Sequence, residues 1–380
     1  MKLALFFTFG VSLKQWLNAG LFDREKLLYE ELLRKEIVSK VLWFTCGAKD
    51  KKIAEQLKQT GKLHADIEVI QIPTAFGFAG GKFLYSLLLP LIKKESLKDA
   101  DVLMTNQMSG SWSAVLTKKV IKKPLIVRTG YTWSRLKDSQ GTWGLKKIFI
   151  KKAEVFAYRN ADFAVVSTQS QAEFIKDRYS VAEKNIFIIP NYIDINLFKP
   201  DNSVEKYPDR LLYVGRISKE KNLFNLTSAV AKAGMQLDLY GCGDLTEDLK
   251  HYAQQNGAKL AFKGAVANNL LPQIMNRYRF FILPSLHESL PKSLLEAMAC
   301  GLVCIGTDVT GINEVISDGV NGWLAKDTDS SSLFESIEKA KSNPPEAIAK
   351  AAVETIENKY SLGYVVDEYS KLLEKIKNAC

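Results

Sequence analysis

The sequence has few of the residues from which metal and thiol sites are built. Its 380 residues include three histidines and an odd number of cysteines, five, scattered along the chain. Cys300 and Cys304 lack the spacing and the companion ligands of a zinc site. We therefore expect reduced thiols and a cytoplasmic protein.

Long apolar runs are also missing. The nearest candidate for a membrane span, Phe83–Ile92, is interrupted by Pro90 and has half of the roughly 20 residues required. The opening Lys2–Gly10 lacks the small-residue cleavage site of a secretory signal, so we interpret it as a buried strand. Gly10 is the single glycine in the turn after this strand, where a nicotinamide oxidoreductase or a sugar-nucleotide epimerase needs GxGxxG. These two enzyme classes therefore remain only as alternatives.

What the sequence does contain is a regular alternation of two patterns. With 47% hydrophobic residues, the chain is long enough for about two domains with sizeable cores. Continuous Val/Ile/Leu/Phe runs alternate with segments of helical period, which is typical of parallel sheets covered by helices on both faces. The expected strands are Leu3–Phe9, Lys40–Thr45, Ile67–Ile72, Val102–Asn106, Leu125–Arg128, Phe163–Ser167 and Ile186–Pro190, then Leu211–Val214, Leu237–Tyr240, Lys259–Phe262, Phe280–Leu283 and Val303–Ile305. The helical segments expected between them include Leu13–Arg34 and Leu271–Tyr278.

The alternation stops once and then starts again. The polar segment Asn191–Asp209 separates the two series, and we interpret it as a linker. The predicted fold class is α/β, with two doubly wound, Rossmann-like domains at residues 1–190 and 191–359. Ligands of such folds bind at the carboxyl ends of the strands, so we expect a cleft there.

The positive charge lies in the first half. Residues 1–200 hold 32 Lys/Arg against 19 Asp/Glu, a charge of +13, and the remainder carries −3, which gives the net +10. An anionic partner, either a membrane surface or a polyphosphate substrate, and a merely solvated basic surface are both consistent with this asymmetry. Nucleic acid is not expected, because the basic residues are not interleaved with exposed aromatic residues.

Cations and glycines follow two strands of the second series. Gly215 and Arg216 come at the end of one strand and Lys221 just before the next helix. Together they could bind a diphosphate, although a basic surface loop would look the same. Gly241 and Gly243 end the following strand, where a nucleotide could lie against the turn or the glycines could form a plain tight turn.

Two glutamates eight positions apart, Glu288 and Glu296, bracket the start of a helix. Pro291 is placed to begin this helix and Gly301 to end it. The amino end of the helix would attract a phosphate, and carboxylates beside a phosphate accept hydrogen bonds from hydroxyls. That combination suits a sugar nucleotide. For Glu296 we expect a half-buried carboxylate rather than a solvated one, because apolar residues surround it.

These motifs, taken in order, resemble the carboxyl half of the family-4 retaining glycosyltransferases. The resemblance implies the GT-B fold, with a last helix at about 360–380 that packs back on the first domain. It also implies that Arg216 and Lys221 bind the donor diphosphate, that Glu296 holds the ribose and that Glu288 contacts the transferred sugar. The residues that carry the resemblance are Gly215-Arg216 with Lys221, Tyr240–Gly243, Phe262–Gly264, Pro284-Ser285 with Glu288 and Glu296, Ala297–Gly301, Gly306–Glu314 and the joining segment Pro190–Pro200.

From the resemblance we predict a retaining, metal-independent glycosyltransferase without a cofactor. Its donor would be a nucleotide-diphosphate sugar, for which the family likeness favours a UDP-linked one, and its acceptor a glycan or a lipid-linked molecule used in cell-surface polysaccharide synthesis. Arg216, Lys221 and Glu288 are the predicted catalytic residues. The predicted donor-binding residues are Gly10, Gly215, Arg216, Lys221, Gly241, Gly243, Lys263, Glu288, Ser289, Leu290, Pro291, Lys292, Ser293 and Glu296.

The chain departs from the family pattern at two places. Pro291 has no N–H to donate in a loop that usually carries glycines. Many members place a histidine after the strand Leu125–Arg128, and this chain has Arg128-Thr-Gly-Tyr131 instead. Arg128 or Tyr131 would then line the acceptor side, or Tyr131 would be a buried tyrosine satisfied by hydrogen bonding.

Further expectations concern a metal site, a membrane surface and the alternative functions. Asp327-Thr-Asp329 has the form of a metal-binding DxD, but its place before a Ser-rich segment favours a helix cap. The apolar helix Phe83–Ile92, with the lysines of Lys118–Lys123, could lie in the headgroup region of an anionic membrane or simply cover the sheet. The remaining alternatives to a transferase are a non-catalytic nucleotide-sugar-binding protein and a phosphorylase that uses pyridoxal phosphate.

Overall fold

The chain forms two compact units. The computed structural model describes residues 1–131, 133, 134 and 144–379. Unit 1 comprises Met1–Ile189 and the chain from Val365 onward, and unit 2 comprises Pro190–Tyr364. Each unit has its own hydrophobic core, built on its own sheet.

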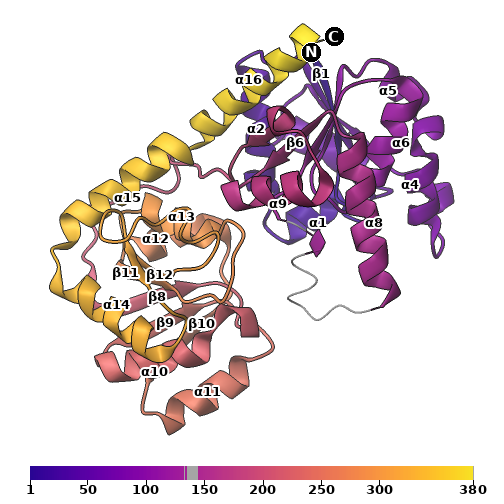
Figure 1. Ribbon diagram of the computed structural model, residues 1–380. Helices are drawn as coiled ribbons and strands as arrows, with labels where there is room; N and C mark the ends of the chain where they lie inside the picture. The colour runs from indigo at the N-terminus through magenta and orange to yellow at the C-terminus, as the bar shows by residue number, and fades with distance from the viewer. Residues whose placement is uncertain (132, 135–143, 380) are drawn as a thin grey trace. The chain divides into compact units, whose positions relative to one another are not determined.

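Unit 1 contains a parallel sheet in the order β3-β2-β1-β4-β5-β6-β7 (Figure 1). Its strands are β1 (Lys2–Phe6), β2 (Lys40–Phe44), β3 (Ile67–Ile70), β4 (Val102–Thr105), β5 (Leu125–Arg128), β6 (Phe163–Val166) and β7 (Ile186–Ile188). Its helices are α1 (Leu13–Asn18), α2 (Phe22–Arg34), α3 (Asp50–Gln59), η1 (Thr74–Phe76), α4 (Gly81–Ile92), α5 (Lys94–Lys98), α6 (Ser111–Ile121), α8 (Leu145–Asn160), α9 (Gln169–Tyr179), η2 (Glu183–Asn185) and α16 (Leu362–Ala379).

Unit 2 repeats the plan with a parallel sheet in the order β10-β9-β8-β11-β12-β13. Its strands are β8 (Tyr207–Val214), β9 (Gln236–Tyr240), β10 (Lys259–Gly264), β11 (Tyr278–Leu283), β12 (Val303–Thr307) and β13 (Trp323–Ala325). Its helices are η3 (Lys219–Lys221), α10 (Leu223–Ala233), α11 (Thr246–Gln255), η4 (Asn268–Leu270), α12 (Leu271–Met275), α13 (Lys292–Ala299), α14 (Ser330–Ser342) and α15 (Pro345–Lys359). The predicted α/β class, with two doubly wound sheets, is confirmed.

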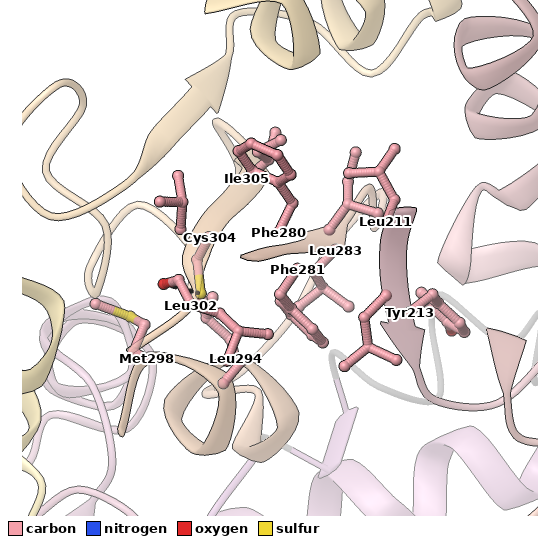
Figure 2. Close-up of a cluster of buried hydrophobic side chains, with 14 of the residues drawn as sticks. Leu211, Tyr213, Phe280, Phe281, Leu283, Leu294, Met298, Leu302, Cys304 and Ile305 are labelled. Atoms are coloured by element: carbon pink, nitrogen blue, oxygen red, sulfur yellow. Dashed lines mark hydrogen bonds between the residues drawn. The ribbon is translucent and has the colours of Figure 1, made fainter. Parts of the chain in front are cut away.

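The core of unit 2 shows why these runs form buried parallel strands. Successive side chains of a strand point to opposite faces of the sheet, so a strand covered on both faces must be apolar throughout. Figure 2 shows Phe281 and Cys304 on the face that packs on Leu294 of α13, with Phe280 on the other face. All four side chains are at most 3% exposed.

Several boundaries differ from the prediction, and β13 was not predicted. The helical pattern Leu13–Arg34 is two helices, because Gly20 adopts a φ of +64° and ends α1. The expected helix Leu271–Tyr278 stops at Met275, and Tyr278 already belongs to β11. The expected linker Asn191–Asp209 is shorter, because β8 begins at Tyr207.

A backbone hydrogen bond joins the beginning and the end of unit 2. Ile193, in the expected linker, is buried and donates a backbone hydrogen bond to Tyr360 at 2.8 Å. The helix α16, yellow in Figure 1, follows directly, and from Val365 onward it belongs to unit 1. There Lys35 pairs with Asp367 at 2.9 Å. The last helix therefore returns to the first unit.

Candidate active site

The candidate site lies where the strand order of unit 2 reverses. β8 is flanked by β9 on one side and by β11 on the other, so the connections after β8 and β11 leave the sheet in opposite directions. Ligands of doubly wound sheets bind at such a switch point. Arg216 and Lys221 follow β8, and Glu288 follows β11. The backbone N–H of Leu286 donates to the carbonyl of Glu220 at 2.9 Å, which joins the two loops.

An ion pair between Lys221 and Glu288 forms the centre of the site. Lys221 Nζ contacts Glu288 Oε1, and the two side chains are only 15% and 13% exposed. The Ser285 hydroxyl donates to the same carboxylate oxygen at 2.7 Å. Ser285 is itself fully buried, and its carbonyl accepts from the Thr307 hydroxyl at 2.5 Å. Glu288 is thus fixed by Lys221 in the connection after β8 and by Ser285 in the loop after β11, and Thr307 of β12 holds Ser285 in turn.

Arg216 lies at the surface of the same loop. Its side chain is 70% exposed and pairs with Glu220 at 3.3 Å. Burial alone would raise the pKa of the Glu220 carboxyl, but its own backbone N–H and the positive charges of Arg216 and Lys221 lower this pKa. The buried Tyr213 hydroxyl donates to the carbonyl of Arg216 at 2.7 Å. The backbone is therefore fixed, while the guanidinium is accessible to an anion.

The predicted glycines have a structural reason of their own. A Cβ on Gly241, whose φ is +146°, would lie 1.8 Å from the carbonyl oxygen of Gly215. A Cβ on Gly243 would lie 2.1 Å from the carbonyl oxygen of Ile217. The turn after β9 therefore packs backbone to backbone on the loop that carries Arg216.

Helix α13 begins one residue later than expected. Pro291 is its N-cap, with a φ of −75° and a ψ of 113°, and Lys292 is its first helical residue. Gly301, with a φ of +70°, ends the helix as predicted. The first-turn N–H groups of a helix lack partners within it, so this end of α13 is suited to an anion.

Glu296 is more deeply buried than expected. It is 4% exposed rather than half-buried, and its Oε1 accepts from the Asn268 side chain at 2.9 Å. Asn268 lies in η4, which follows β10. Burial of a carboxylate is tolerated when its oxygens are hydrogen-bonded. The predicted contact of Glu296 with a ribose stays a prediction.

The remaining donor-site candidates of unit 2 lie in different settings. Leu290 is 5% exposed and belongs to the core, so only its backbone could reach a ligand. Lys292 lies over the ring of Tyr192 at 5.6 Å. Lys263 is exposed at the end of β10. Ser289 and Ser293 are partly buried on either side of the α13 amino end.

Three candidates belong to unit 1. Gly10 follows β1 and has a φ of +81°. The Arg128 side chain, at the end of β5, donates to the carbonyl and to the side-chain oxygen of Asn106, both at 3.2 Å. Burial raises the pKa of the Tyr131 hydroxyl. Their predicted ligand contacts are not tested by these interactions.

Sequence reasoning missed two residues of the site. Asn268 is not among the predicted site residues, although an asparagine after the end of a strand is a signal for the ligand-binding edge of the sheet. Gly311 lies within the Gly306–Glu314 motif but is not among them either. A Cβ there would lie 2.2 Å from the carbonyl oxygen of Ser289, and the φ of Gly311 is +86°. Gly311 thus lets the β12 loop pack on the backbone that follows Glu288.

The expected helix cap at Asp329 is confirmed. Its side chain accepts from the backbone N–H of Ser332 at 2.8 Å at the start of α14. A carboxylate used in this way stabilises the helix by about 1 kcal/mol.

Comparison with known proteins decides the family. Residues 28–197 match the family model described as Glycosyltransferase Family 4, and residues 194–361 match that described as Glycosyl transferases group 1. The chain belongs to the family-4 glycosyltransferases. It is accordingly a glycosyltransferase with the GT-B fold.

Relatives and solved structures agree with this membership. The chain is 24% identical to the alpha-D-kanosaminyltransferase of Streptomyces kanamyceticus, over 92% of the chain and 98% of the relative. It is 26% identical to the UDP-Gal:alpha-D-GlcNAc-diphosphoundecaprenol alpha-1,3-galactosyltransferase of Escherichia coli, over 66% and 68%. The crystal structure of Anabaena HepE in complex with UDP has a TM-score of 0.75 at 17% identity, and the match covers 99% of this chain and 100% of that one.

The family membership also bears on the departure at Tyr131. The chain is a glycosyltransferase although none of its three histidines, His64, His251 and His287, lies in the segment directly after β5. Within the described residues, no helix is both long and apolar enough to cross a membrane.

Proposed function

We propose that the protein transfers a sugar from a UDP-sugar to a glycan or lipid-linked acceptor, with retention of the anomeric configuration and without a metal or other cofactor. The observation that carries the proposal is the partly buried Lys221–Glu288 pair, which brings a cation suited to phosphate and a carboxylate suited to hydroxyls together at the switch point of unit 2. The alternatives are a non-catalytic nucleotide-sugar-binding protein, an epimerase or oxidoreductase, and a pyridoxal-phosphate phosphorylase.

Cleavage of the sugar–phosphate bond leaves negative charge on the diphosphate. In the proposed reaction Arg216, Lys221 and the amino end of α13 neutralise this charge as it forms. Arg216 is exposed enough to close on the diphosphate, while Lys221 is already held in place. Preorganised cations of this kind supply what a bound metal ion supplies in other transferases.

Glu288 would hold the sugar. Lys221 and Ser285 both bind Oε1, so in the proposal Oε2 accepts from a hydroxyl of the transferred sugar. The carboxylate of Glu288 is fixed by these partners, and the buried carboxylate of Glu296 accepts a hydrogen bond from the Asn268 side chain. In the proposal both glutamates bind hydroxyl groups, and neither is assigned to attack the anomeric carbon. This supports attack by the acceptor on the face from which the diphosphate leaves, with the leaving diphosphate as the base.

The names of relatives support the choice of donor and acceptor. The E. coli relative uses a UDP-galactose donor and an undecaprenyl-linked acceptor, as its name says, and HepE was solved with UDP. A relative 30% identical over 49% of this chain is named for amylovoran biosynthesis in Erwinia amylovora. We therefore propose a role in polysaccharide or glycoconjugate synthesis.

The test is a panel of nucleotide sugars, scored for thermal stabilisation and for release of the nucleoside diphosphate. A ligand at 100 times its Kd should stabilise the protein by about 2.7 kcal/mol. Stabilisation by a UDP-sugar together with UDP release would support the transferase. Stabilisation without release, with every acceptor offered, would support the binding protein. Visible absorbance from pyridoxal phosphate would point to the phosphorylase.

A further inference from the structure

Helix α4 of unit 1 is apolar on all sides but only half covered. Tyr85 and Leu89 are at most 5% exposed and pack in the core of unit 1. Phe83, Leu84 and Leu91 on its other side are 44%, 43% and 66% exposed. A helix that is apolar all round is normally buried on all sides, in a protein core or in lipid. The covered side makes α4 part of the fold, and the uncovered side lacks an occupant within the described residues.

Neighbouring helices extend this uncovered surface. Figure 1 shows α4, α6 and α8 side by side in unit 1. Trp112 of α6 joins them, since its ring lies 6.2 Å from that of Phe83 and 5.8 Å from that of Phe149 on α8. We name the exposed apolar side chains here the α4–α8 face, and its members are Phe78, Phe83, Leu84, Leu87, Leu91, Ile148 and Phe149, each at least 39% exposed.

A basic hollow continues the α4–α8 face along α8. It has a volume of about 340 Å³ and is lined by Lys151, Lys152, Val155, Phe156, Arg159 and Asn160. All of these lining residues lie in the described part of the chain, and they include three cations and no carboxylate. Ile148 of the face shares a side of the helix with Lys152, four residues later. Lys119 of α6 also lies over the ring of Phe156 at 5.1 Å.

We propose that the α4–α8 face docks unit 1 on an anionic bilayer surface. Apolar side chains would enter the boundary between headgroups and acyl chains, and the cations of the hollow would bind lipid phosphates. The apolar side chains and the cations occur on one surface, and a negatively charged lipid surface is complementary to both. The inference goes beyond the proposed function, because binding to vesicles requires no turnover.

The structure also changes which lysines matter. Lys118 of the lysine-rich segment is paired with Asp162 at 2.7 Å, so it is already neutralised. Lys151 and Lys152 in the hollow are the better candidates. The two interpretations of Phe83–Ile92 are therefore not exclusive, since one side of α4 covers the sheet and the other is available to a membrane.

The test is co-sedimentation with vesicles of phosphatidylcholine, with and without phosphatidylglycerol, at low and high salt. Wild type should bind only the anionic vesicles, and less at high salt. Lys151→Gln/Lys152→Gln should weaken binding about 30-fold, since each lysine near an anionic surface contributes about 1 kcal/mol. The control Lys326→Gln/Lys350→Gln removes the same charge from unit 2 and should bind like wild type.

A second pair of variants tests the apolar part. Leu84→Ser/Leu91→Ser should weaken binding at least about tenfold. Leu270→Ser/Val320→Ser is matched to it in exposure, at 45% and 61%, but lies in unit 2 and should change nothing. Unchanged thermal unfolding would show that each variant is folded.

Three results would overturn the proposal. The first is that wild type does not bind anionic vesicles at low salt, and the second is that both apolar variants bind them equally well. The third is that the protein binds no vesicles but self-associates in sedimentation velocity, and that Leu84→Ser/Leu91→Ser abolishes this self-association. The last would assign the face to a second copy of the chain. Failure of vesicle binding would leave UDP-sugar turnover intact, so the two proposals fail separately.

Discussion

The Lys221–Glu288 pair should serve stability and activity at once, and substitution can separate the two roles. Lys221→Met removes the cation and leaves the carboxylate of Glu288 in a setting that is 13% exposed. Breaking one partner of a buried pair costs about 3–5 kcal/mol, and residual exposure puts this pair at the low end, about 3 kcal/mol. For a unit of this size that corresponds to a loss of about 6–12 °C in Tm.

The double variant Lys221→Met/Glu288→Gln should recover much of this stability. It leaves no unpaired charge, and replacement of a buried pair by neutral residues is often nearly neutral. The matched control is Lys250→Met/Glu247→Gln in α11, where the pair is 2.8 Å apart but 42% and 75% exposed. Surface pairs contribute at most about 1 kcal/mol, so each control variant should lie close to wild type.

Activity should not recover with stability. The double variant lacks both the cation proposed to bind phosphate and the carboxylate proposed to bind the sugar. For the UDP-sugar identified in the panel, kcat/KM should therefore fall at least about 30-fold, which corresponds to a loss of about 2 kcal/mol in transition-state stabilisation. The measurements are urea unfolding and UDP release on the same preparations, at a temperature where all variants are folded. A double variant that regains both stability and turnover would refute the catalytic role and leave only a structural ion pair.

Three further predictions follow from the same structure. Arg216→Ala should lower kcat/KM about 30-fold or more but leave Tm within a degree or two, since its side chain is 70% exposed; full activity would remove Arg216 from the diphosphate site. Turnover should persist in excess EDTA, and activity that is lost and then restored by Mg²⁺ or Mn²⁺ would contradict the metal-independent mechanism. Thermal stability should fall between about pH 9 and 12, because burial, with smaller contributions from Glu296 and Glu314, raises the pKa of Cys300 to about 12 and that of Tyr360 to about 12, whereas both groups ionise at lower pH in the unfolded chain. A Tm that stays level to pH 11 would refute this assignment.

Local pattern was enough to predict the two sheets. Most strands contain a continuous apolar run because both their faces are covered there, and each helix has its own period, so both signals lie within short stretches of sequence. Boundaries were less secure. Gly20 is a stop signal for α1, but the apolar period continues through it, so the pattern predicts one helix over Leu13–Arg34 where the structure has two. Tyr278 continues the helical pattern and yet begins β11, because it pairs with Tyr207 of β8.

Depth of burial could not be read from the pattern either. The apolar neighbours of Glu296 indicated partial burial, but its final exposure depends on Asn268, which comes from a different strand connection. In the same way, nothing in α4 itself indicates that one apolar side packs and the other remains exposed. That outcome depends on where Trp112 of α6 and Phe149 of α8 lie.

The sequence by itself determined which chemistry is present: cations after one strand, carboxylates after another, and a helix whose amino end suits an anion. Only the tertiary structure decided that Lys221 and Glu288, 67 residues apart, form one partly buried pair. The physical reason is the strand order. β8 lies between β9 and β11, and this arrangement is set by how the whole sheet packs, so no short stretch of sequence encodes which two loops meet.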